Sequence, residues 1–508
     1  MMPKGSMTSV QDIQRSEWSN YESSLINQAP VTPDKEAISP RQAYIALAVL
    51  CLVKMMSTMD MFIISGVLPS IQTSFDLNDM SAGFFQTAVF ASTPLWSPLF
   101  GYLGGRFNQK YILMGGICIY TVTTICSSFL TKSLFWLLVL LRFMAGIGDS
   151  AISTMSIQIL SVLFSGGQLT TMFCMFASLT ASGCGLGLIV GAGITTLTGD
   201  WRWALRIIPI LNVVGIILVG FLLPNQVRSA SYTNGQEVKK KSTYREDVKY
   251  LLKNKSYILS TLAFVAANFS NSAMTVWTST FMSRARVAQG TQPPCNNLPC
   301  DSTDSYIFGA VTILTAFLGG GLGAGSSRQW RDKVPNVVIC TAAILGFVLC
   351  SFFFIFMASE SILVTYIFIG LRGIFIVALH SVAADITLYI VVPTRRALAV
   401  AFMFTSTVLG GTSGGSSIIG VVSDAIRNSN PPSDDWSFLS LKYSLLICPC
   451  VAVLSGILFI ITSFYIVEDK RAVQEWIDDQ LQKIDKRRQT TFVDVKLHSL
   501  LIAGKLLQ

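Results

Sequence analysis

The sequence predicts an all-α membrane protein of twelve transmembrane helices in two pseudo-symmetric six-helix bundles, and three observations support this fold class. The 508-residue chain is 51% hydrophobic and only 13% charged, whereas soluble proteins carry about 25% charged residues. Apolar runs of about 20 residues, long enough to cross a bilayer, recur along the chain. Basic residues gather in alternate connections between these runs, as the positive-inside rule requires of cytosolic loops.

The first six apolar runs define an N-terminal bundle over residues 43–224. They cover roughly 43–69, 81–104, 111–130, 134–163, 170–196 and 203–224. The polar residues before them, 1–42, are expected to be a disordered cytosolic N-terminus. A membrane β-barrel is not expected, because its strands would appear as short alternating segments rather than long apolar runs.

The second six runs define a C-terminal bundle over residues 256–467. They cover roughly 256–283, 305–326, 336–358, 361–391, 397–426 and 441–467. A polar cytosolic linker, 225–255, separates the bundles. The cytosolic tail, 468–508, places Val473, Trp476 and Leu481 on one side of a helix. Such a helix lies on the inner leaflet or docks against the bundle.

The distribution of charge sets the predicted orientation. The net charge is +9, and the basic residues lie in connections that share one side of the membrane. Connections on the opposite side carry acids and few bases, so both termini are predicted to be cytosolic. The bases are spread over loops rather than gathered on one folded face, so nucleic acid is not an expected partner.

Short sequence motifs in the first half are repeated in similar form at equivalent positions of the second half. Gly101-Tyr-Leu-Gly-Gly ends the second run and precedes the basic turn RFNQK, while Gly320-Gly-Leu-Gly-Ala ends the eighth and precedes SSRQWRDK. Leu141-Arg142 in the fourth run matches Leu371-Arg372 in the tenth. Glycine-rich helix ends also recur because small residues let helices approach. Two matches at equivalent runs nevertheless favour a duplicated six-helix unit with a substrate site between the halves.

The segment GYLGGRFNQK resembles the signature loop of major facilitator transporters, and further segments resemble the Spinster family of that superfamily. These are STMDMFIISGVLP in the first run, RFMAGIGDSAIST in the fourth, GDWRWALR at the turn into the sixth and ADITLYIVVPTRR at the end of the tenth. The resemblance covers about residues 43–467. It implies a cytosolic gate formed by signature residues of both halves: Gly101, Leu103, Gly104, Arg106, Lys110, Asp385, Arg395 and Arg396.

The resemblance implies a proton-linked, alternating-access carrier of lysophospholipids or sphingosine-type lipids. It implies no cofactor beyond the coupling proton, and we expect a monomer. The N-terminal ESSLI is half of an acidic dileucine sorting pattern, which favours a lysosomal or late endosomal membrane and leaves the plasma membrane open. In the family, a charged cluster in the first and fourth spans is tied to protonation, and its positions here are Asp60, Met61, Arg142 and Asp149.

The residues themselves support such a cluster. A carboxylate within hydrocarbon is costly and is by default a functional-site candidate, and Asp60 lies deep in the first run. Arg142 and Asp149 are seven residues apart, about two helical turns, so they point the same way. Arg142 could therefore be shared by two carboxylates. Arginine keeps its proton, so the acids would be the switch. A static salt bridge that pins two helices is the alternative.

The chain departs from the family pattern at several positions. Met61 stands where the family has an arginine, and Met61 is a candidate for the substrate cavity. Lys54 is six residues before Asp60, on another side of the helix, and is expected to be a poor replacement for that arginine. Gly105 occupies the aspartate position of the signature loop.

Two further side chains are candidates in the tenth run. His380 would titrate near neutral pH, or it forms a hydrogen bond between helices. Arg372 would pair with two oxygens of a lipid phosphate, or it packs between helices. The two readings stay open for each residue.

Among the eleven cysteines, Cys295 and Cys300 differ from the rest. They lie in the polar non-cytosolic loop PPCNNLPCDSTD, and a loop-closing disulfide is expected there if that side is oxidising. Neither metal-ligand spacing nor a catalytic or phosphate-loop motif is found, so an enzyme is not expected. Besides a lipid carrier, the sequence leaves open a major facilitator carrier of another organic solute, such as an organic anion, and a non-transporting, receptor-like member.

Overall fold

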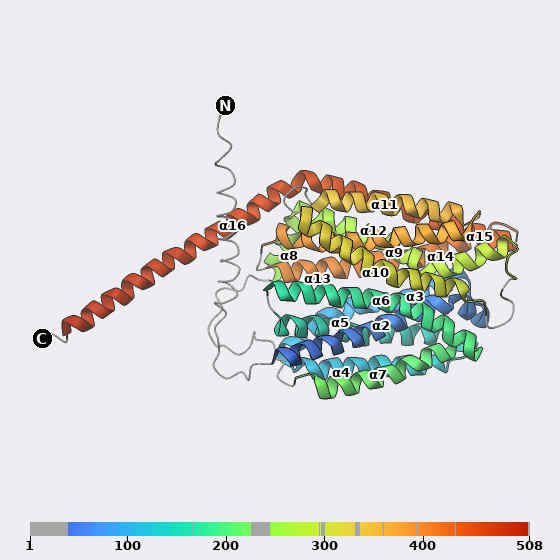
Figure 1. The fold of residues 1–508 in the computed structure, drawn as a ribbon, viewed down its shortest axis with the longest axis horizontal. Coiled ribbons are helices and arrows are strands. Elements are labelled where there is room, and N and C mark those ends of the chain that lie inside the picture. Colours follow the sequence, from blue (N-terminus) through green and yellow to red (C-terminus); the bar gives the residue numbers. More distant parts are fainter. Residues whose placement is uncertain are drawn as a thin grey trace, which may run out of the picture.

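The computed structural model describes residues 39–164, 166–224, 244–293, 295, 300–330, 336–358, 360–392, 395–431 and 433–505. Within these residues the regular structure is helical, and most helices run side by side along one axis (Figure 1). This axis defines two ends of the bundle. We call the end where α2 begins at Pro40 the terminal end, and the end where α2 stops at Phe75 the distal end.

Six long helices form the N-terminal half. They are α2 (Pro40–Phe75), α3 (Asp79–Arg106), α4 (Gln109–Ser128), α5 (Phe135–Leu163), α6 (Gly166–Thr198) and α7 (Arg202–Leu222). The start of α2 follows from its sequence. Ser39 and Gln42 exchange side-chain and backbone hydrogen bonds of 3.3 Å, and Pro40 takes the first helical position. This capping box satisfies donors that a helix N-terminus leaves unpaired.

The C-terminal half begins with the long helices α9 (Lys255–Ala288), α10 (Thr303–Trp330), α11 (Asn336–Met357) and α12 (Ile362–Ile390). The next span is composite: α13 (Arg396–Ser406), a π-helical turn over Thr407–Thr412, and α14 (Ser413–Asn428). The last span joins α15 (Asp434–Leu445) to α16 (Ile447–Lys505). Pro449 lies in the first turn of α16, where its missing N–H is tolerated.

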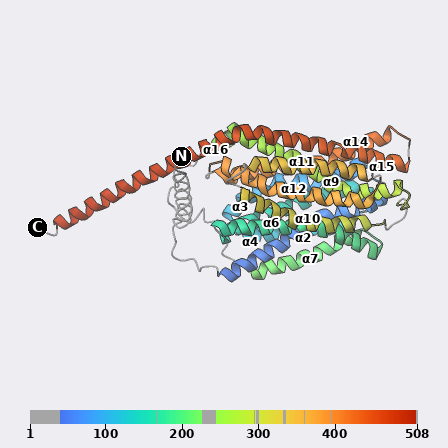
Figure 2. The ribbon, with the colours of Figure 1, turned by 45° about the horizontal axis from the view of Figure 1, so that its top comes forward.

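The linker helix α8 (Tyr244–Lys253) docks at the terminal end. Tyr250 of α8 packs in a small apolar cluster with Val392, Val473 and Trp476, so the linker and the start of the tail share one contact. Beyond this point α16 continues as one helix and projects away from the bundle (Figures 1 and 2). The side chain of Leu481, which the sequence places on the apolar side of the tail, lies outside the described residues.

The twelve spans expected from the sequence are present as helical columns in the described residues when composite spans are counted once. Ten helical segments of this part are long and apolar enough to cross a membrane. The other two, α3 and α9, have 28 and 34 residues but carry many polar side chains. Gln86, Asn268 and Thr278 are among those that are buried, and burial against other helices shields them from lipid.

The two halves meet along α3 with α14 and along α6 with α10, and small residues bring these helices together. A Cβ atom on Gly185 of α6 or on Gly309 of α10 would collide with the other residue's carbonyl oxygen, and one on Gly83 would lie 2.8 Å from the Ser416 carbonyl oxygen. Only glycine permits such backbone approach. One large apolar cluster joins side chains of both halves, including Phe85 and Trp277.

Candidate functional site

A buried ion pair joins α2 to α5 in the middle of the N-terminal half. Arg142 Nη1 donates to Asp60 Oδ2 at 2.9 Å, and both side chains are at most 1% exposed. Tyr120 of α4 also donates its hydroxyl hydrogen to Asp60 Oδ2, at 2.7 Å. Three helices are thus tied together at one carboxylate oxygen.

The pair is incompletely satisfied. Asp60 Oδ1 and the Nε and Nη2 atoms of Arg142 are buried without a hydrogen-bond partner. Buried polar atoms are nearly always paired, and each unpaired one costs free energy. Three buried polar atoms of the pair therefore keep unfilled hydrogen-bonding capacity.

Asp149 has a different base. Lys54 Nζ donates to Asp149 Oδ1 at 2.6 Å, and Ser57 donates to the same oxygen at 2.6 Å. Arg142 therefore serves Asp60 and is not shared by the two carboxylates, contrary to the possibility raised from the sequence. Lys54 does not replace an arginine beside Asp60, but it supplies a positive charge to the second acid, which the sequence analysis missed.

Met61 follows Asp60 in the sequence, but its side chain is not among the described hydrogen-bond partners of the Asp60 carboxylate, which are Arg142 and Tyr120. Its side chain is 6% exposed and belongs to the large apolar cluster, and its carbonyl oxygen accepts a 3.0 Å hydrogen bond from Gln86. The structure places this cavity candidate in the buried apolar cluster that joins the two halves.

Arg372 of α12 is a buried guanidinium without a carboxylate partner. It is 3% exposed. Its Nη1 atom lies 3.5 Å from Asn271 Oδ1 of α9, Nε has no partner, and the group stands 5.7 Å from the centre of the Phe347 ring. The C-terminal half thus has an amide opposite its arginine where the N-terminal half has Asp60.

His380 contacts α9 from α12. Its Nε2 atom is 2.9 Å from Asn268 Oδ1 and its Nδ1 atom is 2.6 Å from the Ile376 carbonyl oxygen, while Phe264 meets the ring edge to face at 5.1 Å. Asn268 donates its own amide hydrogen to the Phe264 carbonyl oxygen. The imidazole therefore bonds to its own helix through Nδ1 and to α9 through Nε2.

The signature-loop residues of α3 lie at the terminal end and mostly contact α5. Gly104 is buried where a Cβ atom would collide with Gln158, and the Gly101 carbonyl oxygen accepts a 3.4 Å hydrogen bond from Gln158. Leu103 packs against the apolar cluster of this half. Arg106 is exposed, with its guanidinium 4.3 Å from the Tyr102 ring centre.

The remaining basic gate candidates bind helix ends. Lys110 Nζ donates to the carbonyl oxygens of Gly220 and Leu223, both at 2.8 Å, and so caps the C-terminus of α7. Arg396 Nε donates to the Val391 carbonyl oxygen at 3.2 Å.

Arg395 ties the linker helix to the C-terminal half. Its Nε atom donates to Asp247 Oδ1 of α8 at 2.6 Å. The backbone of Asp385 lies in α12, and its side chain is outside the described residues.

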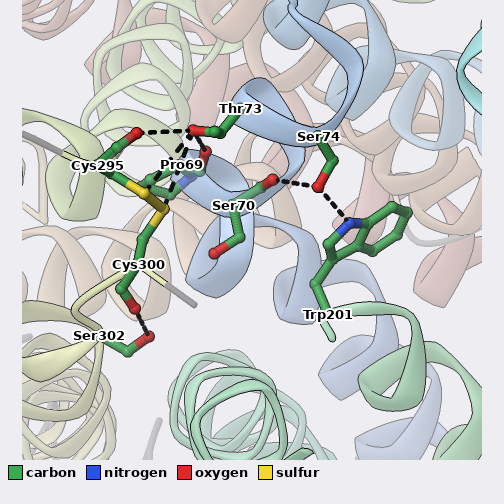
Figure 3. The surroundings of a disulfide bond; sticks show 8 residues. All are labelled: Pro69, Ser70, Thr73, Ser74, Trp201, Cys295, Cys300 and Ser302. Carbon is green, nitrogen blue, oxygen red and sulfur yellow. Dashed lines mark hydrogen bonds between the residues drawn. A yellow bond between two sulfur atoms is a disulfide. The ribbon is translucent and has the colours of Figure 1, made fainter. Parts of the chain in front are cut away.

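The disulfide expected in the distal loop is present between Cys295 and Cys300, whose Cα atoms are 5.3 Å apart (Figure 3). The loop lies against the distal end of α2, because the Thr73 hydroxyl donates to the Cys295 carbonyl oxygen at 3.4 Å. Next to Thr73, Ser74 accepts a 2.9 Å hydrogen bond from the Trp201 indole. The disulfide loop of the C-terminal half is thereby attached to the N-terminal half.

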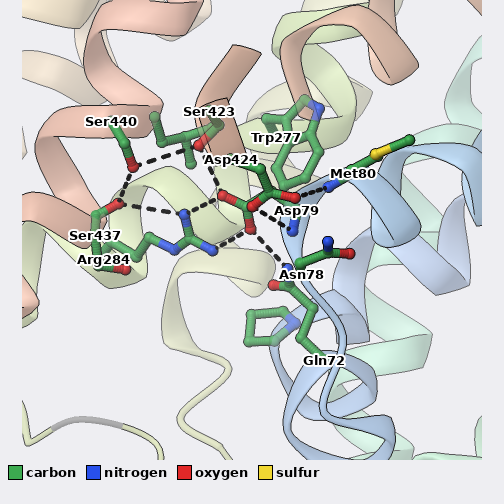
Figure 4. Close-up of polar contacts among 12 residues, drawn as sticks. Gln72, Asn78, Asp79, Met80, Trp277, Arg284, Ser423, Asp424, Ser437 and Ser440 are labelled. Carbon is green, nitrogen blue, oxygen red and sulfur yellow. Dashed lines mark hydrogen bonds and ion pairs between the residues drawn. The ribbon is translucent and has the colours of Figure 1, made fainter. Parts of the chain in front are cut away.

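A second charged cluster, which the sequence analysis did not predict, joins the halves at the distal end (Figure 4). Arg284 of α9 binds both carboxylate oxygens of Asp79 at the start of α3, with 2.8 Å between Nη1 and Oδ2. Ser423 of α14 donates to Asp79 at 2.7 Å, and Gln72 of α2 does so at 2.9 Å. We call these residues, with Asp424, the distal cluster.

Asp424 completes the distal cluster from α14. Its two carboxylate oxygens accept the backbone N–H groups of Asp79 and Met80, at 3.0 and 2.7 Å. An acid of the C-terminal half therefore caps a helix of the N-terminal half, where the helix dipole favours negative charge. Acids were expected in the outer connections, but Arg284 lies 205 residues from Asp79 in the chain, and only the packing of the halves brings the two together.

No group of three or more metal-ligand side chains occurs in the part of the chain that the structure describes. What the described geometry offers is a set of buried charges on helices that belong to both halves of a symmetric bundle. Such charges, held within a membrane domain, are typical of ion and substrate pathways.

Comparison with known proteins agrees with this fold. The sequence model of the Major Facilitator Superfamily matches residues 50–415. Protein spinster homolog 3 of Danio rerio is 43% identical over 447 residues, covering 88% of this chain and 90% of that protein. Sphingosine-1-phosphate transporter SPNS2 of Xenopus tropicalis is 37% identical over 445 residues, covering 87% of this chain and 86% of that protein.

A solved structure shares the fold. The crystal structure of a bacterial homolog to the human lysosomal transporter Spinster, in an inward-facing and unoccupied conformation, matches with a TM-score of 0.71 at 16% sequence identity, covering 85% of this chain and 99% of that chain. The fold and the superfamily match define a membrane transporter of the major facilitator class rather than an enzyme. With 43% identity over almost the whole relative, the chain belongs to the Spinster family of that superfamily.

Proposed function

We propose that this protein carries lysophospholipids or sphingosine-type lipids by alternating access and that a proton drives the cycle. Its relatives include proteins named as sphingosine-1-phosphate transporters, which supports the lipid class. The observation that carries the coupling is the Asp60–Arg142 pair, at 2.9 Å and withdrawn from solvent.

The pair is suited to convert protonation into movement. Arginine stays charged, so Asp60 is the partner whose charge changes. Protonation of Asp60 removes the attraction that holds α2 to α5 and weakens the bond from Tyr120 of α4. A buried pair that loses one charge leaves the other uncompensated, at a cost of about 3–5 kcal/mol. Rearrangement of these helices, or arrival of an anionic substrate group, relieves that cost.

Arg372 supports a phosphate-bearing substrate. Its guanidinium is buried, and its described polar contact is the single 3.5 Å approach to Asn271. Guanidinium groups bind phosphate through two parallel hydrogen bonds, and an uncompensated buried charge favours such a partner. Lysophospholipids and phosphorylated sphingosine both offer this group. His380 lies on α12 about two helical turns from Arg372. It would add a titratable hydrogen-bond donor on the same helix.

The distal cluster supports the alternating-access part of the proposal. It joins α2 and α3 of one half to α9 and α14 of the other. In the proposed cycle these bonds hold the distal side closed, and they break when substrate is exchanged there. In the same cycle the signature-loop residues at the terminal end would form the second gate.

We place the protein in a membrane with both termini cytosolic, because the basic connections Arg106–Lys110 and Arg395–Arg396 lie on the side of the termini. A lysosomal or late endosomal membrane is the proposed location and a monomer the proposed state; ESSLI lies outside the described residues. Terminal tags that resist protease added to the lumenal side, and colocalisation with a lysosomal marker, support this placement.

The proposal is tested by uptake into proteoliposomes. The purified protein is reconstituted, and labelled sphingosine-1-phosphate and lysophosphatidylcholine are offered with and without a pH gradient. Saturable uptake that the gradient increases, and that Asp60→Asn makes insensitive to the gradient, supports the proposal. Gradient-independent uptake of lipid contradicts the coupling.

The same assay separates the other functions that the sequence left open. Arg372 is a cation without an acidic partner, so it also suits an organic anion that is not a lipid. Uptake of such anions without uptake of lipids would establish the solute carrier. Binding of lipid without transport of any solute would establish the receptor-like alternative.

A further inference from the structure

The carboxylate of Asp149 is surrounded by donors from three helices. Oδ1 accepts from Lys54 Nζ and from Ser57, both at 2.6 Å, and these residues lie on α2. Oδ2 accepts from Ser153 of α5 at 3.4 Å and lies 3.3 Å from the Thr93 hydroxyl of α3, which also donates to the Val89 carbonyl oxygen at 3.2 Å. Each oxygen of this buried carboxylate therefore has two partners.

Lys54 is equally well placed. Its side chain is 12% exposed, and besides Asp149 its ammonium group donates to Ser153 at 2.8 Å. Each charge is thus matched by its neighbour and by hydroxyl groups. Asp60 differs, because Oδ1 has no partner while Oδ2 accepts two hydrogen bonds.

We propose that Lys54 is a built-in counter-charge that takes the place of a proton at Asp149, so that of these two acids only Asp60 exchanges a proton during transport. This inference rests on the proposed proton-coupled function and assigns the coupling step to one carboxylate. Lys54 is then a positioning residue that sets how the transporter depends on pH.

The physical basis is the cost of a buried charge. A buried carboxylate needs either an opposite charge or a proton, because removing one member of a buried pair leaves an uncompensated charge. With Lys54 present, the charge of Asp149 is already balanced and a proton would displace the ammonium group from its partner.

Few other titratable groups face the Lys54–Asp149 pair. Tyr120 of α4 interacts electrostatically with Asp60, Asp149 and Arg142. Cys184 of α6 interacts with Lys54. The partners from α3 and α5 are the hydroxyls of Thr93 and Ser153, which do not titrate. Lys54 is therefore the nearest group that can balance Asp149.

The test compares pH profiles of uptake for Lys54→Met, Lys54→Arg and the double variant Lys54→Met/Asp149→Asn. In Lys54→Met, Asp149 must take up a proton to be neutral, so uptake is lost near neutral pH and returns on acidification. We expect its profile to move toward acid by at least about one pH unit, a tenfold change in proton concentration. The double variant, which has no charge to balance, and Lys54→Arg, which keeps the charge, return the profile toward that of the unaltered protein.

Thermal unfolding of the same variants in detergent separates this inference from the proposed function, because it needs no substrate. Lys54→Met is expected to lose stability as pH rises, and the double variant to lose this dependence. If the unaltered protein takes up no lipid, the proposed function fails and the unfolding profiles alone decide the role of Lys54. A Lys54→Met profile parallel to that of the unaltered protein, or a double variant as displaced as Lys54→Met, would overturn the inference.

Discussion

Asp60 and Asp149 are buried carboxylates, and each pairs with a base between α2 and α5. In one pair the acid lies on α2 and the base on α5, and in the other pair this arrangement is reversed. The bases are Lys54 on α2 and Arg142 on α5. The helices are antiparallel, so a spacing of six residues on α2 matches a spacing of seven on α5. The Lys54–Asp149 pair therefore lies about two helical turns closer to the terminal end than the Asp60–Arg142 pair.

This geometry explains what sequence reasoning could and could not predict for the site. The resemblance and the helical spacing singled out Asp60, Arg142 and Asp149. Lys54 was tested only against Asp60, from which it points away, because the register of α2 on α5 is fixed by packing that one sequence does not reveal. Arg284 was missed for the same reason, since it lies at the end of a polar helix with no visible partner.

The Asp60–Arg142 pair is expected to respond to loss of one partner and to recover when both are neutral. Arg142→Gln leaves a buried, uncompensated carboxylate, so the free energy of unfolding should fall by about 3–5 kcal/mol near neutral pH. Asp60→Asn/Arg142→Gln should recover most of that loss. Thermal unfolding in detergent measures both effects, and a double variant less stable than Arg142→Gln would refute the pairing.

Arg372 is expected to determine headgroup preference. Arg372→Gln removes the buried cation while keeping most of the side-chain volume, so it should reduce uptake of sphingosine-1-phosphate about tenfold or more relative to sphingosine, since a charge-assisted bond contributes more than about 1.4 kcal/mol. Competition between the two lipids measures the ratio. An unchanged ratio would assign Arg372 to helix packing, and inhibition by inorganic phosphate alone would indicate a site for the free anion.

At the scale of helices, the spans were predictable because hydropathy follows from the bilayer itself. The predicted run 43–69 lies inside α2, Pro40–Phe75, since the helix extends past the apolar part at both ends. The π-helical turn at Thr407–Thr412 was not predicted as such, although the Gly- and Ser-rich sequence marks it. π-Helical turns occur mostly as single-turn interruptions of α-helices, frequently at functional sites. The position of this turn within its span is known only from the structure, where it packs against α9.

The approach of α14 to α9 depends on glycine. A Cβ atom on Gly415 would collide with the Phe269 carbonyl oxygen, whereas one on Gly321 of α10 would meet nothing within 4 Å. Gly415→Ala should therefore destabilise the protein by about 1–3 kcal/mol. Gly321→Ala, the matched control, should be neutral or stabilising by up to about 1 kcal/mol. Equal thermal stability of the two variants would contradict the close contact.

The distal cluster is expected to hold α3 against α14. Arg284→Gln removes the bidentate partner of Asp79, so the distal side should open more often and a cysteine placed at Thr87, between α3 and α14, should react faster with a maleimide. The measurement uses a background without free cysteines.

The matched control for the distal cluster is Arg202→Gln. It breaks the partly exposed 3.5 Å pair with Asp200 within one half, and exposed pairs contribute little. Labelling at Thr87 should stay unchanged in this control. Equal labelling rates in Arg284→Gln and the unaltered protein would show that the cluster does not close the distal side.

At the scale of the whole molecule, the halves share a fold but not a charge balance. In the N-terminal half Lys54 and Arg142 balance Asp149 and Asp60, whereas Arg372 in the C-terminal half faces an amide. The sequence predicted the symmetry through repeated motifs and the fold through the family resemblance. It could not predict the asymmetry, because which charges are paired depends on contacts between helices far apart in the chain.

This asymmetry suggests that the two halves have different roles: the N-terminal half responds to protons, and the C-terminal half responds to the negative charge of the substrate. The most direct measurement of this central claim is proton movement on addition of lipid to proteoliposomes that contain a pH-sensitive dye. We predict that sphingosine-1-phosphate causes proton flux with the unaltered protein and that Asp60→Asn abolishes the flux while lipid binding persists. Lipid transport without proton flux, or unchanged flux in Asp60→Asn, would contradict the account.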